Sequence, residues 1–161
     1  GRAVVFTSLE DLAERIDTDD LDVRADDILV LQNAGPKSPS GMPEAGYIPI
    51  PKKLAQAGVR DMIRISDCRM SGTAFGTIVL HVTPEAAMGG AIGLVQNGDE
   101  IRLSVSNKSL ELLVNNAELE RRRQTTPARP AKPSRGYAKL YADHVMQADQ
   151  GADFDFLMAP S

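Results

Sequence analysis

The sequence of 161 residues contains one cysteine and no tryptophan, and only 4% of its residues are aromatic. The single thiol, Cys68, excludes an internal disulfide and cannot by itself hold an iron–sulfur cluster, which takes several thiolates. So few aromatic rings argue against a surface that stacks nucleic-acid bases. No apolar run reaches the roughly 18 residues of a membrane span, and no signal peptide is visible. We therefore expect a cytoplasmic protein that binds neither nucleic acid nor membrane.

The totals are those of an ordinary globular domain, with 42% hydrophobic residues, 25% charged residues and a net charge of −4. Length alone predicts one domain. The only basic run, RRR at 121–123, follows NAELE and indicates a solvated helix face rather than a phosphate site. A strand is expected from Ala3 with no leader before it, so we expect the chain to be a piece of a longer polypeptide.

The hydrophobic pattern of the first half predicts short strands and short helices. Strands are expected over 3–7, 28–31, 59–65 and 77–82, of which the last could also be a helix end. Helices are expected over 9–16, from Pro49 or Pro51 to Gly58, and over 84–88. Residues 17–27 hold six aspartates but lack the glycine and distal glutamate of an EF-hand, which favours a solvated loop over a calcium site.

The second half has one strong local signal, LVQNGDEIRLSV, in which Asn97-Gly98 predicts a type I′ hairpin. A second turn is expected at 107–108, then a charged helix capped by Asn115 or Asn116 and ending at Arg123. Residues 124–135 read as a Pro-rich arm, and 137–147 as an amphipathic helix that docks on another surface, such as a partner subunit. The pattern predicts mainly strands with flanking helices, an α+β fold and not a doubly wound nucleotide fold.

Two loops rich in Gly, Pro and Ser carry the residues most able to do chemistry, Glu44 in NAGPKSPSGMPE and Ser71 in CRMSGTAFG. A serine before Gly-Thr is most often a helix cap or an exposed turn residue. The functional alternative is a catalytic hydroxyl beside the backbone N–H groups of Gly72 and Thr73, which would suit an anionic substrate group. Serine becomes a base only when a histidine or a metal ion lowers its pKa.

Other interpretations of these loops are weaker. Ser71 does not lie in a Gly-x-Ser-x-Gly nucleophile elbow, because Arg69 replaces the first glycine and the last is also missing. A lone Glu44 is usually just exposed, although it could be one ligand of Mg²⁺, with only Asp67 and Glu85 nearby to extend a cage. His81 lies in the apolar run IVLHV, which favours a core position. Cys68 is expected to be a small packed residue.

Together the motifs NAGP…GMPE and RISDCRMSGTAFGTIVLHVTPEAAMGG resemble the C-terminal domain of the dihydroxy-acid dehydratase and phosphogluconate dehydratase family over essentially residues 1–123. The resemblance is greater to the branch that dehydrates sugar acids such as arabinonate and xylonate, on the basis of the segment MSGTAFGTIVLHV and the tail GYAKLYADHVMQADQGADFDFL. The amino-acid-pathway branch more usually reads GRFSGG, from which Met70 and Thr73 depart.

The resemblance implies removal of water from a 2,3-dihydroxy acid to give a 2-keto acid through an enol. It implies that Ser71, as an alkoxide near Mg²⁺, takes the C2 proton, that Thr73 positions it, and that Glu44 is a Mg²⁺ ligand. An iron–sulfur cluster would act on the leaving hydroxyl, with its cysteines and the other Mg²⁺ ligands in an N-terminal domain outside this chain. Neither cofactor would be held by this domain alone.

The resemblance further implies a swivelling β-barrel-like domain, similar to the small domain of aconitase-type enzymes, and a homo-oligomer acting on a small-molecule sugar acid. The expected organisation is a domain over 1–123, an arm over 124–135 and a C-terminal helix and tail over 136–161. Two alternatives stay open: a branched-chain dihydroxy-acid dehydratase, and a non-catalytic anion-binding or docking module.

Overall fold

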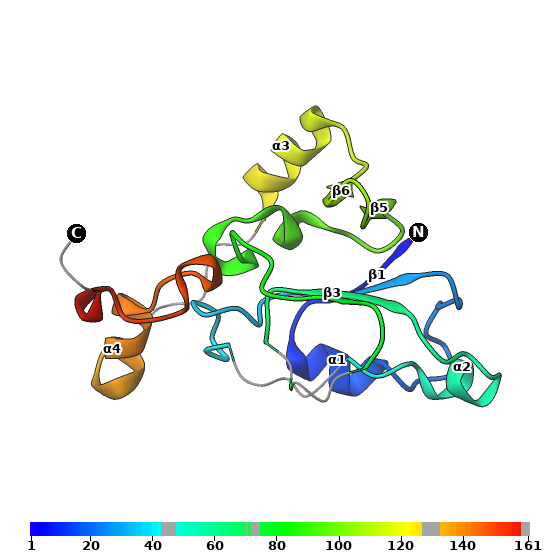
Figure 1. Ribbon diagram of the computed structural model, residues 1–161, viewed down its shortest axis with the longest axis horizontal. Coiled ribbons are helices and arrows are strands. Elements are labelled where there is room, and N and C mark those ends of the chain that lie inside the picture. Colours follow the sequence, from blue (N-terminus) through cyan, green and yellow to red (C-terminus); the bar gives the residue numbers. More distant parts are fainter. Residues whose placement is uncertain (43–47, 70, 72–74, 127–132, 159–161) are drawn as a thin grey trace.

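A parallel sheet of four strands forms the centre of the computed structural model, which describes residues 1–42, 48–69, 71, 75–126 and 133–158 (Figure 1). The strands lie in chain order, each parallel to the next. They are β1 (Ala3–Phe6), β2 (Ile28–Leu31), β3 (Ile63–Ser66) and β4 (Ile78–Val79). Because all four run the same way, the loops that follow them begin at one edge of the sheet.

Both faces of this sheet are covered, which is why β1 and β2 are apolar at every position. Phe6 and Leu31 point to the face covered by α1 (Leu9–Arg15) and α2 (Lys52–Gln56). Val30 and Ile65 point to the other face, toward the 3₁₀ helix η2 (Ala91–Leu94) and strand β5 (Ile101–Ser104). Figure 1 shows these layers, with α1 and α2 below the sheet and β5, β6 and α3 above it. The fold is therefore mixed α/β, with a parallel sheet that the sequence pattern does not reveal.

The first two helices begin and end where the sequence predicts. Ser8 caps α1 by accepting a hydrogen bond from the N–H of Asp11, at 3.2 Å. The side chain of Asp11 also pairs with Arg15 one turn later. Helix α2 follows Pro51, and the chain leaves it through Gly58, whose φ of +94° suits glycine. The expected strands after α2 are shorter in the structure, because β3 begins only at Ile63 and β4 has two residues.

The predicted hairpin at Asn97-Gly98 is wrong. The residues before this turn belong to η2, so only one side of the turn leads into a strand. The turn instead binds β1: the Asn97 side chain accepts from the N–H of Val5 at 2.6 Å, and the Gly98 N–H donates to the carbonyl of Ala3 at 2.9 Å. The true hairpin joins β5 to β6 (Ser109–Leu112) through the second predicted turn, where Lys108 has a φ of +50°.

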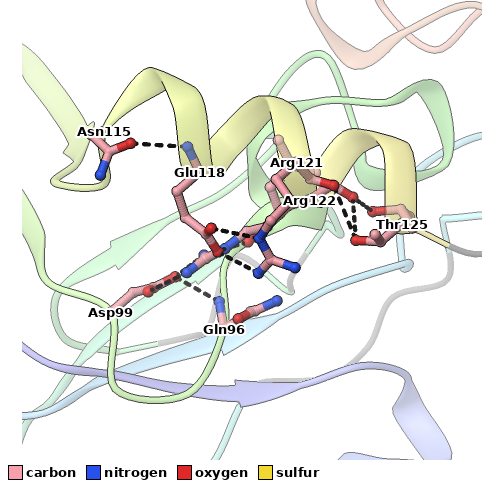
Figure 2. A network of polar contacts seen from close by, with 9 residues as sticks. Gln96, Asp99, Asn115, Glu118, Arg121, Arg122 and Thr125 are labelled. Atoms are coloured by element: carbon pink, nitrogen blue, oxygen red, sulfur yellow. Dashed lines mark hydrogen bonds and ion pairs between the residues drawn. The ribbon is translucent and has the colours of Figure 1, made fainter.

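Helix α3 (Asn116–Thr125) is capped by Asn115, as predicted, and is held down by a buried arginine. Arg122 contacts Asp99 at 2.5 Å, Glu118 at 2.9 Å and the carbonyl of Leu94 at 2.9 Å (Figure 2). The interpretation of the basic run as a solvated face is therefore wrong for Arg122, although its two neighbours in the run are exposed.

The C-terminal segment begins with α4 (Gly136–His144), close to the predicted helix, and continues through the 3₁₀ turns Ala148–Gln150 and Asp155–Leu157. None of the α4 side chains is buried. The Tyr141 hydroxyl donates to the carbonyl of Gly41 at 3.1 Å, so the helix docks on the first loop of its own chain. No helix among the described residues is both long and apolar enough to cross a membrane.

Candidate active site

Of the four residues predicted to act in catalysis, substrate binding or metal binding, Ser71 falls within the described part of the chain, and its side chain is half-buried. Glu44, Gly72 and Thr73 lie outside the described residues, so the predicted meeting of Glu44 with Ser71 stays a prediction. The segments that lead into and out of both loops are described. Their contacts show how the fold positions each loop.

The first loop is fixed from its first residue. Asn33 adopts a left-handed φ of +56°, and its side chain donates to the carbonyl of Thr7 at 2.9 Å. Further along, both the Ser38 hydroxyl and the Met42 N–H donate to the carbonyl of Gly35, at 2.7 and 2.9 Å. The loop thus closes on itself, and the buried Met42 marks the point from which the chain proceeds to Glu44.

Two fully buried carboxylates hold this loop against the rest of the site. Asp67 directly follows β3 and accepts hydrogen bonds from the N–H groups of Ala34, at 3.0 Å, and Ala86, at 2.9 Å. Glu85 accepts from the N–H of Lys37 through both oxygens, at 2.8 and 3.0 Å. Burial raises the pKa of both carboxyl groups, and in Glu85 the charge of Asp67 adds to that effect.

The C-terminal segment completes the environment of Glu85. Gln147 donates to Glu85 Oε1 at 2.6 Å, and its own side-chain oxygen accepts the Glu85 N–H at 3.1 Å. Gly35 also approaches Glu85 so closely that a Cβ there would lie 2.4 Å from Glu85 Oε2. Glycine is therefore required at position 35, because any side chain would separate the loop from this carboxylate.

The loop that carries Ser71 leaves β3 through Cys68. The Cys68 N–H binds the Ser66 hydroxyl at 3.0 Å, and its carbonyl accepts from the His81 N–H at 3.2 Å. Cys68 is fully buried and burial raises its pKa, which confirms the prediction of a packed thiol. The prediction of a core position for His81 is wrong: its side chain is exposed, because β4 has already ended at Val79.

The end of the serine loop is bound by a charged pair beneath it. Arg64, in β3, is 4% exposed and donates to the carbonyl of Phe75 at 2.6 Å. Asp61 accepts from the N–H and the hydroxyl of Thr77, at 3.0 and 2.8 Å, and pairs with Arg64 at 3.0 Å. Burial alone would raise the pKa of Asp61, but the Thr77 hydrogen bonds and the arginine charge lower it.

The described residues do not by themselves fit a Mg²⁺ cage. They contain no cluster of three or more potential ligands among His, Cys, Asp and Glu. The oxygens of Asp67 and Glu85 already accept hydrogen bonds from backbone N–H groups, and burial favours their neutral forms. A metal ion at Glu44 would therefore need ligands from beyond the described residues.

Sequence reasoning missed the residues that position the loops, above all Arg64 and Gln147. Arg64 carries a signal only once the sheet is known to be parallel and covered on both faces, because a charged residue inside such a strand must be paired. Gln147 carries no such signal, since its partner is 62 residues away in the sequence.

Comparison with known proteins gives one family. The profile described as "Dihydroxy-acid/6-phosphogluconate dehydratase C-terminal" matches residues 1–152. The 6-deoxy-6-sulfo-D-gluconate dehydratase of Pseudomonas putida is 52% identical over 99% of this chain and 28% of its own length. The L-arabinonate dehydratase of Rhizobium leguminosarum bv. trifolii is 48% identical over 98% of this chain and 27% of its own.

A dihydroxy-acid dehydratase, from Pyrobaculum aerophilum, is 39% identical over 94% of this chain and 26% of its own length. The chain thus spans little more than a quarter of the relatives it matches. What the relatives do as whole proteins depends also on the part that this chain lacks.

Proposed function

The chain belongs to the dihydroxy-acid/6-phosphogluconate dehydratase C-terminal family, and from this premise we propose that it is half of the active site of a hydro-lyase. The reaction would remove water from a 2,3-dihydroxy acid and leave a 2-keto-3-deoxy acid. The observation that carries the proposal is the family match over residues 1–152, which includes both loops. The fold supports it, because the described parts of both loops are fixed by buried polar groups.

In this proposal the Ser71 hydroxyl, as alkoxide, takes the proton from C2, and the leaving hydroxyl departs from C3. The backbone N–H groups of Gly72 and Thr73 bind the substrate, and the Thr73 hydroxyl positions the serine. Glu44 would hold Mg²⁺ in part, and the ion, when bound, would supply the positive charge that lowers the pKa of the serine hydroxyl enough for its alkoxide to act as a base.

We assign sugar acids as the substrate class. The relatives with sugar-acid names are 48% and 52% identical, whereas the dihydroxy-acid dehydratase of Pyrobaculum aerophilum is 39% identical. Branched-chain dihydroxy acids are the alternative within the same reaction. Assay of a pentonate and a branched-chain dihydroxy acid with the full-length protein separates the two, because the higher kcat/KM identifies the branch.

The remaining parts of the proposal concern the whole protein. An N-terminal domain would supply the iron–sulfur cluster and the other Mg²⁺ ligands, and the assembly would be a cytoplasmic homo-oligomer. Within this chain we keep the division at 1–123, 124–135 and 136–161, and the similarity of the first part to the swivelling β-barrel-like domain of aconitase-type enzymes.

The decisive experiment replaces Ser71 by alanine in the full-length protein that contains this chain. We expect the rate of 2-keto acid release to fall by about 10³-fold or more, because the proton acceptor is lost while binding groups remain. A matched control is Ser106→Ala, an exposed serine in the β5–β6 turn, which should leave turnover unchanged. Near-normal turnover of Ser71→Ala would refute the base assignment.

Glu44→Gln tests the metal role independently. We expect the Mg²⁺ concentration for half-maximal activity to rise, because an amide oxygen is a weaker ligand than a carboxylate. An unchanged Mg²⁺ titration would contradict the ligand role. Absence of dehydratase activity toward both substrate classes in the metal- and cluster-loaded wild type would instead favour the non-catalytic anion-binding module.

A further inference from the structure

We propose that Arg64 is a positioning residue that fixes the loop carrying Glu44 and the loop carrying Ser71 relative to each other. This inference rests on the proposed function. Its guanidinium donates one hydrogen bond to the first described residue after Glu44, at the exit of the first loop, and one to a residue near the end of the serine loop. Nη1 donates to the carbonyl of Ile48, where the first loop ends, at 3.3 Å. Nη2 donates to the carbonyl of Phe75, where the serine loop ends, at 2.6 Å.

The position of this guanidinium is itself fixed. Arg64 is 4% exposed and belongs to β3, where it pairs in register with Leu29 of β2 and Ile78 of β4. Its Nε donates to the carbonyl of Met62 at 3.2 Å, and Asp61 holds Nη2 at 3.0 Å. A planar fork with several donors in fixed directions can reach two separate carbonyls at once, which an ammonium group cannot do in the same geometry.

Gly76 shows how closely the serine loop is seated on this pair. It has a φ of +103°, and a Cβ at this position would lie 2.1 Å from Asp61 Oδ1 and 2.3 Å from Arg64 Nη2. The chain therefore passes directly over the guanidinium with no room for a side chain. A movement of Arg64 is therefore expected to shift the end of the loop that carries Ser71.

The loops are also anchored at their other ends, but by separate groups. Asp67 holds the start of the first loop through the N–H of Ala34, and Ser66 holds the start of the serine loop through the N–H of Cys68. Arg64 donates a hydrogen bond near the end of each loop, to the carbonyls of Ile48 and Phe75. Its loss should leave each loop attached but free to shift relative to the other.

The chain contains a matched control for the merely structural effect of such a residue. Arg122 is also buried, at 8% exposure, and also binds a carboxylate, Asp99, and a backbone carbonyl, that of Leu94. It anchors helix α3 on the opposite side of the sheet from α1 and α2 (Figure 1). Its described partners Asp99, Glu118 and Leu94 lie in neither loop. Arg→Lys at each position removes the same fork from a similar environment.

The experiment compares Arg64→Lys with Arg122→Lys in the full-length, metal- and cluster-loaded enzyme. Thermal unfolding, kcat, KM and the Mg²⁺ dependence of the rate are measured for each. We expect both variants to lose thermal stability, but only Arg64→Lys to lose kcat, by about 10- to 100-fold, because displacement of a reacting group by about 1 Å can cost that much. The Mg²⁺ concentration for half-maximal rate should rise for Arg64→Lys and stay within about twofold for Arg122→Lys.

Equal, small changes of kcat in both variants would overturn the inference while leaving the proposed function intact, since the wild type would still be active. An inactive wild type would instead refute the proposed function. If Arg64→Lys does not fold, Asp61→Asn decides: it weakens the hold on Arg64 and Thr77 and leaves the Ile48 contact in place. Because the Ile48 contact remains, the Mg²⁺ titration of this variant should be unchanged. A kcat loss of at least fivefold with that unchanged titration supports the positioning role of Arg64, and an unchanged kcat overturns it.

Discussion

Two regions of this molecule use carboxylates in opposite ways. At the edge of the parallel sheet where the loops begin, Asp67 and Glu85 accept hydrogen bonds mainly from backbone N–H groups, and burial raises their pKa. Beside α3, Asp99 and Glu118 face Arg122, and the pKa of Glu118 is lowered to about 2 by Arg121 and Arg122. Burial at the loop edge opposes ionisation of the carboxyl groups, whereas around α3 the ion pairs are stabilised by ionisation of the carboxyl groups.

The difference indicates what each region is built for. Ion pairs around α3 fasten a peripheral helix to the turn that precedes β5. Desolvated carboxylates at the loop edge are unfavourable for stability at neutral pH, and such groups concentrate at functional sites. They also have a structural role here, because each one joins backbone segments that are far apart in sequence.

Removing the arginine of the α3 region should give the largest effect on stability. Arg122→Ala would leave Asp99, whose side chain is 11% exposed, without its cation, and a broken buried pair costs roughly 3 kcal/mol. Denaturant unfolding of the 161-residue chain measures this loss. Arg123→Ala is the control, because the pair that Arg123 forms with Glu120 in the same helix is exposed. Similar losses in the two variants would contradict the anchoring role of Arg122.

At the edge of the sheet where the loops begin, stability should change with pH in the opposite direction to stability around α3. The folded-state pKa of Glu85 lies above the ordinary value of 4.5, so the folded chain binds this proton more tightly than the unfolded chain. Stability from this group is present below about pH 4.5 and falls as pH rises through the folded pKa. Glu85→Gln keeps an acceptor for Lys37 and Gln147 but removes the titration.

The free energy of unfolding of Glu85→Gln should therefore increase relative to that of the wild type as pH rises above about 4.5. Denaturant unfolding at pH values from 4 to 8 gives the difference directly. Asp67 remains in the variant, and its contribution to stability should still fall as pH rises, because burial raises its pKa as well. A difference between the two proteins that is constant with pH would show that Glu85 ionises in the folded chain as it does in water.

Local features of the fold could be predicted from the sequence wherever the signal lies within a few residues. The cap at Ser8, the stop at Gly58 and the cap at Asn115 are all confirmed, because each depends on neighbouring backbone groups. The Asn97-Gly98 hairpin is wrong for the opposite reason. The turn exists, but its partner is β1, more than 90 residues away, and no local pattern reports that contact.

The candidate site also contains features that could be predicted from the sequence and features that could not. Ser71 and the importance of its loop follow from motifs, and the family match confirms the resemblance on which those motifs depend. The supports of the loop could not be predicted, because Arg64 reads as the polar side of an alternating strand until the sheet is known to be covered on both faces. Glu85 was visible as a carboxylate, but its partner Gln147 belongs to a segment joined to the domain by the Pro-rich arm.

The smallest effect should come from Glu118, and it should have the opposite sign to that of Glu85. Its pKa of about 2 in the folded chain lies below the ordinary 4.5, owing to hydrogen bonds from Arg121 and Arg122. Its contribution to stability is therefore present above about pH 4.5 and is lost as pH falls toward 2. Glu118→Gln should be slightly less stable than the wild type at pH 7, and the two should converge near pH 2. Because Glu118 is partly exposed, salt screens its ion pairs, so denaturant unfolding at low and high salt should show the difference shrinking. A difference that persists at pH 2 would mean that Glu118 acts through packing rather than charge, and the contrast between the two regions would then rest on the loop edge alone.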